Sequence, residues 1–244
     1  MQAKVLMPVD LFGQPADYHT LEPIARREGL QLLRDTAQGF GGLLHGRRAG
    51  AIGDAAATSF FPAKPLAYFG DGGAIFTNDD GLRDILLLLR MHGQGRDRYE
   101  HVYVGYNSRL DTIQAAILIE KLKIFPDEIE KRNAVAKRYN GTFAAFNRIV
   151  VPRVLDGAVS TWAQYTLQVE DRAKFQADLK EAGVPTAVYY PIPLSRQKAY
   201  AHFPSVATPV SEALSGKVVS LPMHPYLDVA TQDRIIAAVL ASAC

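Results

Sequence analysis

The chain has 244 residues, 48% of them hydrophobic and 21% charged, which is an ordinary composition for a folded protein with a substantial core. Its 27 Lys and Arg residues nearly balance 25 Asp and Glu residues without forming a basic stripe, and no apolar run is long enough to span a bilayer. We therefore exclude nucleic acid and membranes as partners. The single cysteine, Cys244, rules out a disulfide framework within one chain, and we expect a cytoplasmic protein.

The first half of the chain alternates short apolar runs with helical patterns. Asp17 is predicted to cap a helix that is stopped by Gly29. Asp79 and Asp80 are predicted to cap a second helix, which ends near Met91. Strands are predicted at Val5–Val9, Leu30 to Asp35, Ala55–Phe61 and Ala74–Thr77. This alternation is typical of α/β layers with a mostly parallel sheet, in which ligands bind at the carboxyl ends of the strands. Asp35 falls at such an end.

A long helical stretch, Leu110–Phe146, follows, and we expect Pro126 to break it. We predict a domain boundary there, with a large domain in residues 1–125 and a linker helix plus a small domain in residues 126–244. The small domain is predicted to be α+β. Its expected strands and helices are Gln164–Val169, Ala173–Ala182, Thr186–Tyr190, Val218–Leu221 and Thr231–Ala241.

Four local motifs contain residues suited to catalysis or ligand binding, although each also has an ordinary structural explanation. In Asp35-Thr36-Ala37-Gln38 the aspartate could simply cap a helix. In Ser59–Leu66 the lysine, Lys64, stands among prolines, phenylalanines and a leucine, where a snorkelling surface lysine is the alternative. Gly70–Gly73 reads as a tight turn before a strand, and Gly105–Asp111 as a loop and cap that open the long helix.

The order and spacing of these motifs resemble those of the DegT/DnrJ/StrS nucleotide-sugar aminotransferases, which use pyridoxal 5'-phosphate (PLP). A carboxylate is followed by a serine, a lysine five residues later, a glycine turn and Asn-x-Arg at a helix start. The likeness runs from Met7 to about Tyr226. Phe60–Leu66 and Asn107–Leu118 are most similar to enzymes that aminate a 3-oxo UDP-N-acetylglucuronic acid for O-antigen, and so for lipopolysaccharide, biosynthesis. Further matching stretches are Leu11–Asp17, His92–Gln94, Gln114–Leu118, Tyr190–Leu194 and Leu221–Pro225.

The resemblance implies an aspartate-aminotransferase-like (fold type I) α/β domain with a mostly parallel sheet, followed by a small α+β C-terminal domain. It also implies the cofactor PLP and a role for several residues. Lys64 would form the Schiff base and act as nucleophile and base. Asp35 would keep the pyridine nitrogen protonated, so that the ring accepts electrons. Gln38 would hydrogen-bond the ring hydroxyl, and Ser59 would bind the phosphate.

The remaining implied roles concern the substrate and a second subunit. Asn107 would reach the phosphate of the cofactor held by the other subunit of a homodimer. Arg109 would meet a carboxylate, either of the amino donor or of a uronic acid, because its planar fork suits that group. Tyr189 and Tyr190 would line the sugar site, although the family often has histidine where Tyr189 stands.

Members of the family begin well upstream of Met1, and that upstream part carries a glycine–serine/threonine phosphate cup and an aromatic ring that stacks on the cofactor. We therefore expect the chain as given to bind PLP weakly. Three interpretations stay open. One is an aminotransferase that uses glutamate as donor, and another is the dehydratase branch, against which Lys64 argues because that branch has histidine there. The third is a truncated, non-catalytic fragment or pseudoenzyme that acts as a binding or interaction protein.

Overall fold

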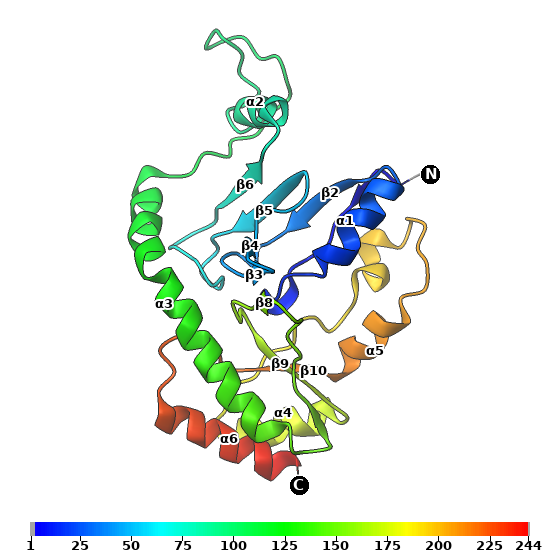
Figure 1. The fold of residues 1–244 in the computed structure, drawn as a ribbon, viewed down its shortest axis with the longest axis vertical. Helices are drawn as coiled ribbons and strands as arrows, with labels where there is room; N and C mark the ends of the chain where they lie inside the picture. The colour runs from blue at the N-terminus through cyan, green and yellow to red at the C-terminus, as the bar shows by residue number, and fades with distance from the viewer. Residues whose placement is uncertain (1–2, 244) are drawn as a thin grey trace. The chain divides into compact units, whose positions relative to one another are not determined.

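The computed structural model describes residues 3–243 and divides the chain into two compact units (Figure 1). Unit 1 comprises Met1–Ile129 and Val154–Thr161, and unit 2 comprises Glu130–Arg153 and Trp162–Cys244. Each unit is described by itself below. No helix in residues 3–243 combines the length and the hydropathy needed to cross a membrane. The same residues contain no cluster of His, Cys, Asp or Glu side chains suited to a metal ion.

Unit 1 is built on a four-stranded sheet in the order β1-β2-β5-β6. Strands β1 (Val5–Leu6), β2 (Gln31–Asp35) and β5 (Ala55–Ser59) are parallel, and β6 (Gly73–Thr77) is antiparallel to β5. The predicted mostly parallel sheet is therefore confirmed. Strand β1 is shorter than predicted, because beyond Leu6 only Val9 pairs again, in a single bridge to Asp35.

Helices of unit 1 begin where the sequence predicts. Asp17 caps α1 (Tyr18–Arg27) by accepting a hydrogen bond from the Thr20 N–H at 3.2 Å, and Asp79 caps α2 (Asp80–Leu89) in the same way. The structure adds the one-turn helix η1 (Leu11–Gly13) and a small sheet in the order β4-β3-β8 that the sequence analysis missed. Its strands are β3 (Leu43–Leu44), β4 (Arg47–Arg48) and β8 (Ala158–Val159).

Two hydrophobic clusters form the core of unit 1. One joins α1 to β2 and contains Tyr18, Ala25, Leu32, Leu44 and Ile52. The other joins the first half of α3 (Thr112–Phe143) to the segment after β5 and contains Phe60, Leu66, Tyr68, Leu118 and Phe125. Because the second cluster includes Leu66 and Tyr68, the segment that carries Lys64 is anchored directly in the core.

Helix α3 is continuous from Thr112 to Phe143, so the predicted break near Pro126 is wrong. A proline inside a helix removes one hydrogen bond and crowds the preceding turn. Here Phe125 and Glu128 are buried on either side of Pro126, which is itself exposed. Burial of these neighbours therefore stabilises the helical conformation on both sides of Pro126. Tertiary contacts of this kind can outweigh the low helix propensity of a single proline.

Unit 2 contains an antiparallel sheet in the order β10-β9-β7, whose strands are Val218–Leu221, Tyr165–Val169 and Ile149–Val150. Its helices are α4 (Arg172–Glu181), α5 (Pro209–Lys217) and α6 (Val229–Ala243), with single turns η2 (Leu194–Arg196) and η3 (Lys198–Tyr200). The predicted strand Thr186–Tyr190 is wrong, since only Ala187 pairs, in one bridge to Ser220. Pro185 and Pro191 flank that segment, and proline cannot donate to a ladder.

Candidate active site

Asp35 and Ser59 end two adjacent parallel strands, and both therefore lie at the carboxyl edge of the sheet. The register pairs Asp35 with Ala57, two residues before Ser59. Asp35 is half-buried, and its Oδ1 accepts the Ala37 N–H at 2.9 Å. In residues 3–243 the other carboxylate oxygen has no hydrogen bond recorded, so one oxygen is held and the other can accept from a ligand.

The Gln38 side chain is buried against the segment that precedes α1. Its Oε1 accepts the Phe12 N–H at 2.6 Å, and its main-chain carbonyl accepts the Thr161 hydroxyl at 2.7 Å. A backbone N–H can only donate, so the amide atom that faces Phe12 is the oxygen. The NH₂ group of the Gln38 amide therefore points away from the Phe12 N–H.

Lys64 lies on the segment that connects β5 to β6. Ser59 Oγ accepts the Phe61 N–H at 3.2 Å, and the Lys64 N–H donates to the Phe61 carbonyl at 2.9 Å, which closes a turn. Lys64 is half-buried, and the four residues after it are buried. At the end of the turn Gly70–Gly73 there is no room for a side chain on Gly73, since a Cβ atom there would lie 2.3 Å from the Thr58 carbonyl oxygen.

Asn107 and Arg109 lie in a different environment, at the base of the loop between α2 and α3. Asn107 pairs with Met91 in a bridge, and Arg109 Nη1 lies 3.4 Å from His92 Nε2. Both side chains are exposed. Among the described residues no hydrogen bond or ion pair joins Asn107 or Arg109 to Asp35, Ser59 or Lys64.

A side chain of α3 nevertheless ties the start of that helix to the Lys64 segment. The Gln114 amide donates to the Phe69 carbonyl at 2.9 Å and accepts the Phe69 N–H at 3.2 Å. This pair of bonds fixes the backbone five residues beyond Lys64, while the Phe69 ring stays exposed.

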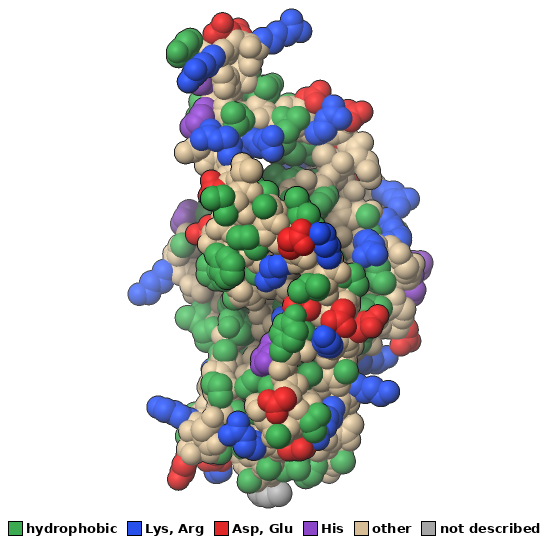
Figure 2. Space-filling model, turned by 90° about the vertical axis from the view of Figure 1, so that its left-hand side faces the viewer, with side chains coloured by type: hydrophobic (Ala, Val, Ile, Leu, Met, Phe, Trp, Pro, Cys, Tyr) green, Lys and Arg blue, Asp and Glu red, His purple; other side chains and the backbone are tan. Residues whose placement is uncertain are grey.

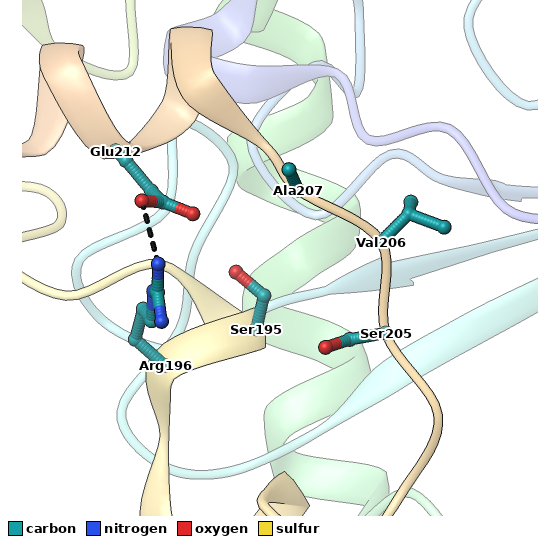
Figure 3. A pocket seen from close by; sticks show the side chains of 6 residues that line it. All are labelled: Ser195, Arg196, Ser205, Val206, Ala207 and Glu212. Atoms are coloured by element: carbon teal, nitrogen blue, oxygen red, sulfur yellow. Dashed lines mark hydrogen bonds and ion pairs between the residues drawn. The ribbon is translucent and has the colours of Figure 1, made fainter.

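Tyr189 and Tyr190 belong to unit 2, so the structure describes them apart from the residues above. Their rings meet edge to face, with centroids 5.6 Å apart. Unit 2 also carries a small pocket lined by Ser195, Arg196, Ser205, Val206, Ala207 and Glu212 (Figure 3). Arg196 Nη2 pairs with Glu212 Oε2 at 2.9 Å there, and none of the residues predicted from the sequence lines this pocket.

The sequence pattern of the DegT/DnrJ/EryC1/StrS aminotransferase family matches residues 1–240. The chain belongs to this family. Aminotransferases of this family depend on PLP, and the fold agrees with theirs. A DegT/DnrJ/EryC1/StrS aminotransferase from Brucella abortus is 47% identical, with a TM-score of 0.93 over 98% of this chain and 64% of its own. Streptomyces venezuelae DesV in complex with a ketimine intermediate is 37% identical, with a TM-score of 0.94 over 98% of this chain and 65% of its own.

Among named family members, the UDP-2-acetamido-2-deoxy-3-oxo-D-glucuronate aminotransferase of Pseudomonas aeruginosa is 47% identical over 237 residues. The match covers 97% of this chain and 65% of that protein. The chain therefore spans about 65% of the length of this relative.

One buried feature was not predicted from the sequence: an ion pair between Asp10 and Arg34, the residue that precedes Asp35 in β2. Both side chains have 0% exposure, and Arg34 Nη2 lies 2.8 Å from Asp10 Oδ2. A signal was present, because Arg34 follows Leu32 at the spacing that puts both on one face of β2. An arginine on the buried face of a strand predicts a buried acidic partner.

Proposed function

We propose that this chain carries the catalytic lysine and the cofactor-ring contacts of a PLP-dependent aminotransferase that acts on a nucleotide-linked keto sugar. The amino donor is glutamate, and the acceptor is a UDP-3-oxo sugar used in O-antigen biosynthesis. One observation carries the proposal: the half-buried Lys64 lies on the segment that leaves the same sheet edge where Asp35 ends β2. A lysine and a carboxylate at the same sheet edge match what PLP chemistry requires.

The side chains at this edge fit the polar groups of PLP. The second carboxylate oxygen of Asp35 can accept from the pyridine N–H, and the Gln38 NH₂ group, turned away from Phe12, can donate to the ring hydroxyl oxygen. Ser59 Oγ already accepts from Phe61, so its own hydroxyl proton is available to a phosphate oxygen. When bound, PLP supplies the electron sink that stabilises negative charge at the substrate carbon.

In this proposal the protein holds the reacting groups and moves one proton. The Lys64 amine would take the proton from the α-carbon of the amino donor and deliver it to C4′ of the cofactor. The Asp35 carboxylate keeps the ring nitrogen protonated throughout. Lys64 is only partly exposed and residues 65–68, which follow it, are buried, so water would have limited access to this segment.

The proposed substrate rests on the Pseudomonas aeruginosa relative, whose name specifies a UDP-linked 3-oxo-glucuronate. That sugar and glutamate both carry a carboxylate, and Arg109 is an exposed guanidinium that can bind one of them in a bidentate manner. Tyr189 and Tyr190 are proposed to line the sugar site. The hydrogen bonds between Arg109 and its carboxylate would form only with substrate present.

We further propose a cytoplasmic homodimer in which Asn107 of one subunit reaches the phosphate bound by the other. The support is a set of apolar side chains that unit 1 leaves in solvent, among them Val104 at 97% and Ile113 at 77% exposure. Figure 2 looks onto the side where α3 lies and shows hydrophobic side chains exposed there. Large apolar side chains with this much exposure are often covered at protein interfaces.

Reduction with borohydride tests the proposal directly. PLP is added to the full chain, the protein is reduced, and peptide mapping locates the pyridoxyl adduct. We expect the adduct on Lys64, with the surface lysines Lys4 and Lys123 as internal controls. Lys64→Arg is the matched variant, because it keeps the positive charge and loses the reactive amine. Adducts on Lys4 or Lys123 with Lys64 unmodified would contradict the assignment. No adduct and no visible absorbance would favour a non-catalytic binding protein.

A further inference from the structure

Behind the candidate site lies a buried polar cluster that none of the proposed roles uses. It consists of Asp10, Tyr18 and Arg34, each with 0% exposure. Asp10 Oδ1 accepts the Tyr18 hydroxyl at 2.8 Å and the Ala16 N–H at 3.1 Å, and Oδ2 accepts Arg34 Nε at 2.9 Å. The Arg34 guanidinium carbon lies 3.9 Å from the centre of the Tyr18 ring. Each oxygen of the Asp10 carboxylate is thus satisfied by contacts inside the protein.

Burying the charges of Asp10 and Arg34 costs free energy, because both groups lose their contact with water. Burial raises the pKa of the Asp10 carboxyl, and the neighbouring Arg34 charge opposes that rise. Arg34 Nη1 has no hydrogen-bond partner in residues 3–243. A buried ion pair of this kind adds little net stability compared with apolar residues, but it fixes one geometry because any displacement leaves a charge unpaired.

The geometry that is fixed is that of residues 10–17, called the Asp10 loop below. Within it Phe12 adopts φ 62° and ψ 5°, a left-handed conformation that is uncommon for a bulky residue. In this conformation the Phe12 N–H reaches Gln38 Oε1 at 2.6 Å. The Asp10 loop therefore determines which atom of the Gln38 amide faces Phe12.

Two further contacts join Asp10 to the segment that bears Asp35 and Gln38. The Asp10 N–H donates to the Asp35 carbonyl at 2.9 Å. A Cβ atom on Gly39 would lie 2.4 Å from Asp10 Cβ, so only glycine allows Asp10 to pack this closely against the turn. Asp10 thus contacts the residues on either side of Gln38 as well as the loop that binds its side chain.

We propose that the buried Asp10–Arg34 ion pair is a positioning element for Gln38, which it holds with the amide oxygen toward Phe12 and the NH₂ group toward the ligand. Gln38 then acts as a hydrogen-bond donor, and the ligand group it recognises is an oxygen acceptor, the ring hydroxyl oxygen of PLP. The identity of the ligand rests on the proposed function. The positioning itself is a property of the protein without ligand.

The first experiment uses the ligand-free protein, so it stands even if the proposed function fails. Amide hydrogen exchange at Phe12, followed by NMR, reports the bond to Gln38 Oε1. We expect slow exchange in the wild type and exchange faster by about tenfold in both Asp10→Asn and Gln38→Met, since each removes the equivalent of one hydrogen bond. Glu22→Gln is the control, because it breaks the ion pair of Glu22 with Arg47 elsewhere in unit 1. Fast exchange at Phe12 in the wild type would overturn the proposal.

The second experiment measures PLP affinity by absorbance titration in the wild type, Asp10→Asn, Gln38→Met and the double variant. Positioning through Gln38 predicts that Asp10→Asn weakens binding about tenfold, but less than about twofold in the Gln38→Met background. The thermal midpoint without ligand should fall equally in both backgrounds. Equal losses of affinity in both backgrounds, with unchanged Phe12 exchange, would show a general structural role instead.

A milder variant covers the case in which Asp10→Asn does not fold. Tyr18→Phe removes the hydroxyl that donates to Asp10 Oδ1 and keeps the ring over Arg34. We expect the Phe12 amide to exchange about threefold faster in Tyr18→Phe than in the wild type. Tyr18→Phe should also weaken PLP binding, but not in a protein that already carries Gln38→Met. Unchanged Phe12 exchange in a folded Tyr18→Phe protein, together with an unchanged affinity, would contradict the proposal.

Discussion

Two regions of unit 1 contribute residues to the proposed site, and they are held very differently. The Asp10 loop and the turn at Asp35–Gly39 are buried and fixed by hydrogen bonds among Asp10, Arg34, Phe12 and Gln38. Asn107 and Arg109 are exposed and make few contacts within the chain. If the proposed function is correct, the chain itself builds the part of the site that faces the cofactor ring, whereas a ligand or a second copy of the chain completes the exposed part.

The largest effect is expected at Lys64, which belongs functionally to the first region. Lys64→Ala should lower transamination by about 10³-fold or more, because the proton-transfer group is lost. Its melting temperature should stay near that of the wild type, since no side-chain hydrogen bond of Lys64 is recorded among the described residues. Activity assays and thermal unfolding of the two proteins check this.

The exposed region, which contains Asn107 and Arg109, can be tested by mixing two variant chains. A Lys64→Ala chain combined with an Asn107→Ala/Arg109→Ala chain should regain part of the activity, because one site of the mixed dimer has all its residues. Absence of recovery after proven subunit exchange would mean that the exposed residues serve the site of their own chain.

The next largest effect concerns folding stability. Asp10→Ala leaves the Arg34 charge buried without a partner and should lower the free energy of unfolding by about 3–5 kcal/mol. Arg109→Ala, in the exposed region, should change it by less than about 0.5 kcal/mol. Urea denaturation of both variants makes the comparison. A similar loss of unfolding free energy in Asp10→Ala and Arg109→Ala would show that the two regions do not differ in how strongly their residues stabilise the fold.

A smaller effect is expected for the contact with the ring nitrogen. Asp35→Asn keeps the acceptor for the Ala37 N–H but removes the negative charge. Replacing a charge-assisted hydrogen bond by a neutral one should weaken PLP binding by about 10- to 100-fold. Equilibrium titration with PLP measures this loss. An unchanged affinity would place the ring nitrogen elsewhere.

The smallest effect is expected at Asp17, where the Asp10 loop reaches the surface. Hydrogen bonds from the Thr20 hydroxyl and N–H lower the pKa of the Asp17 carboxyl. A lowered folded-state pKa means that this stabilisation is present above about pH 3.9, the value in the unfolded chain, and is lost as the pH falls through the folded pKa. Asp17→Asn keeps a good helix cap but should lack this part of the acid dependence. Thermal unfolding between about pH 2 and pH 5 compares the two proteins.

Much of the fold could be predicted because it follows from local pattern. Asp17, Asp79 and Gly29 are strong boundary signals, and the strands that end at Asp35 and Ser59 are short apolar runs. The error at α3 came where tertiary packing overrides a local rule, whereas the prolines beside Thr186–Tyr190 were a local signal against the strand predicted there. Burial of Phe125 and Glu128 carries α3 through Pro126, and no local pattern reveals this.

The candidate site was predicted only in part for a related reason. Lys64, Asp35 and Ser59 could be singled out because order and spacing along the chain identify them. The Asp10–Arg34 pair joins residues 24 positions apart, so the sequence can suggest that Arg34 is buried in β2 but not which acidic residue pairs with it. The left-handed conformation of Phe12 was equally hidden, because glycine rather than phenylalanine normally signals it.

The antiparallel direction of β6 has a consequence for where the lysine can be. Neighbouring parallel strands need a crossover that returns the chain to the opposite edge of the sheet, whereas antiparallel neighbours can be joined without leaving the edge. Because β5 and β6 are antiparallel, the segment from Phe60 to Gly72 starts and finishes at the sheet edge where β2 also ends. The segment that carries Lys64 is therefore tethered at both ends to the edge where Asp35 lies. The length of this segment could change without moving the lysine to the far side of the sheet.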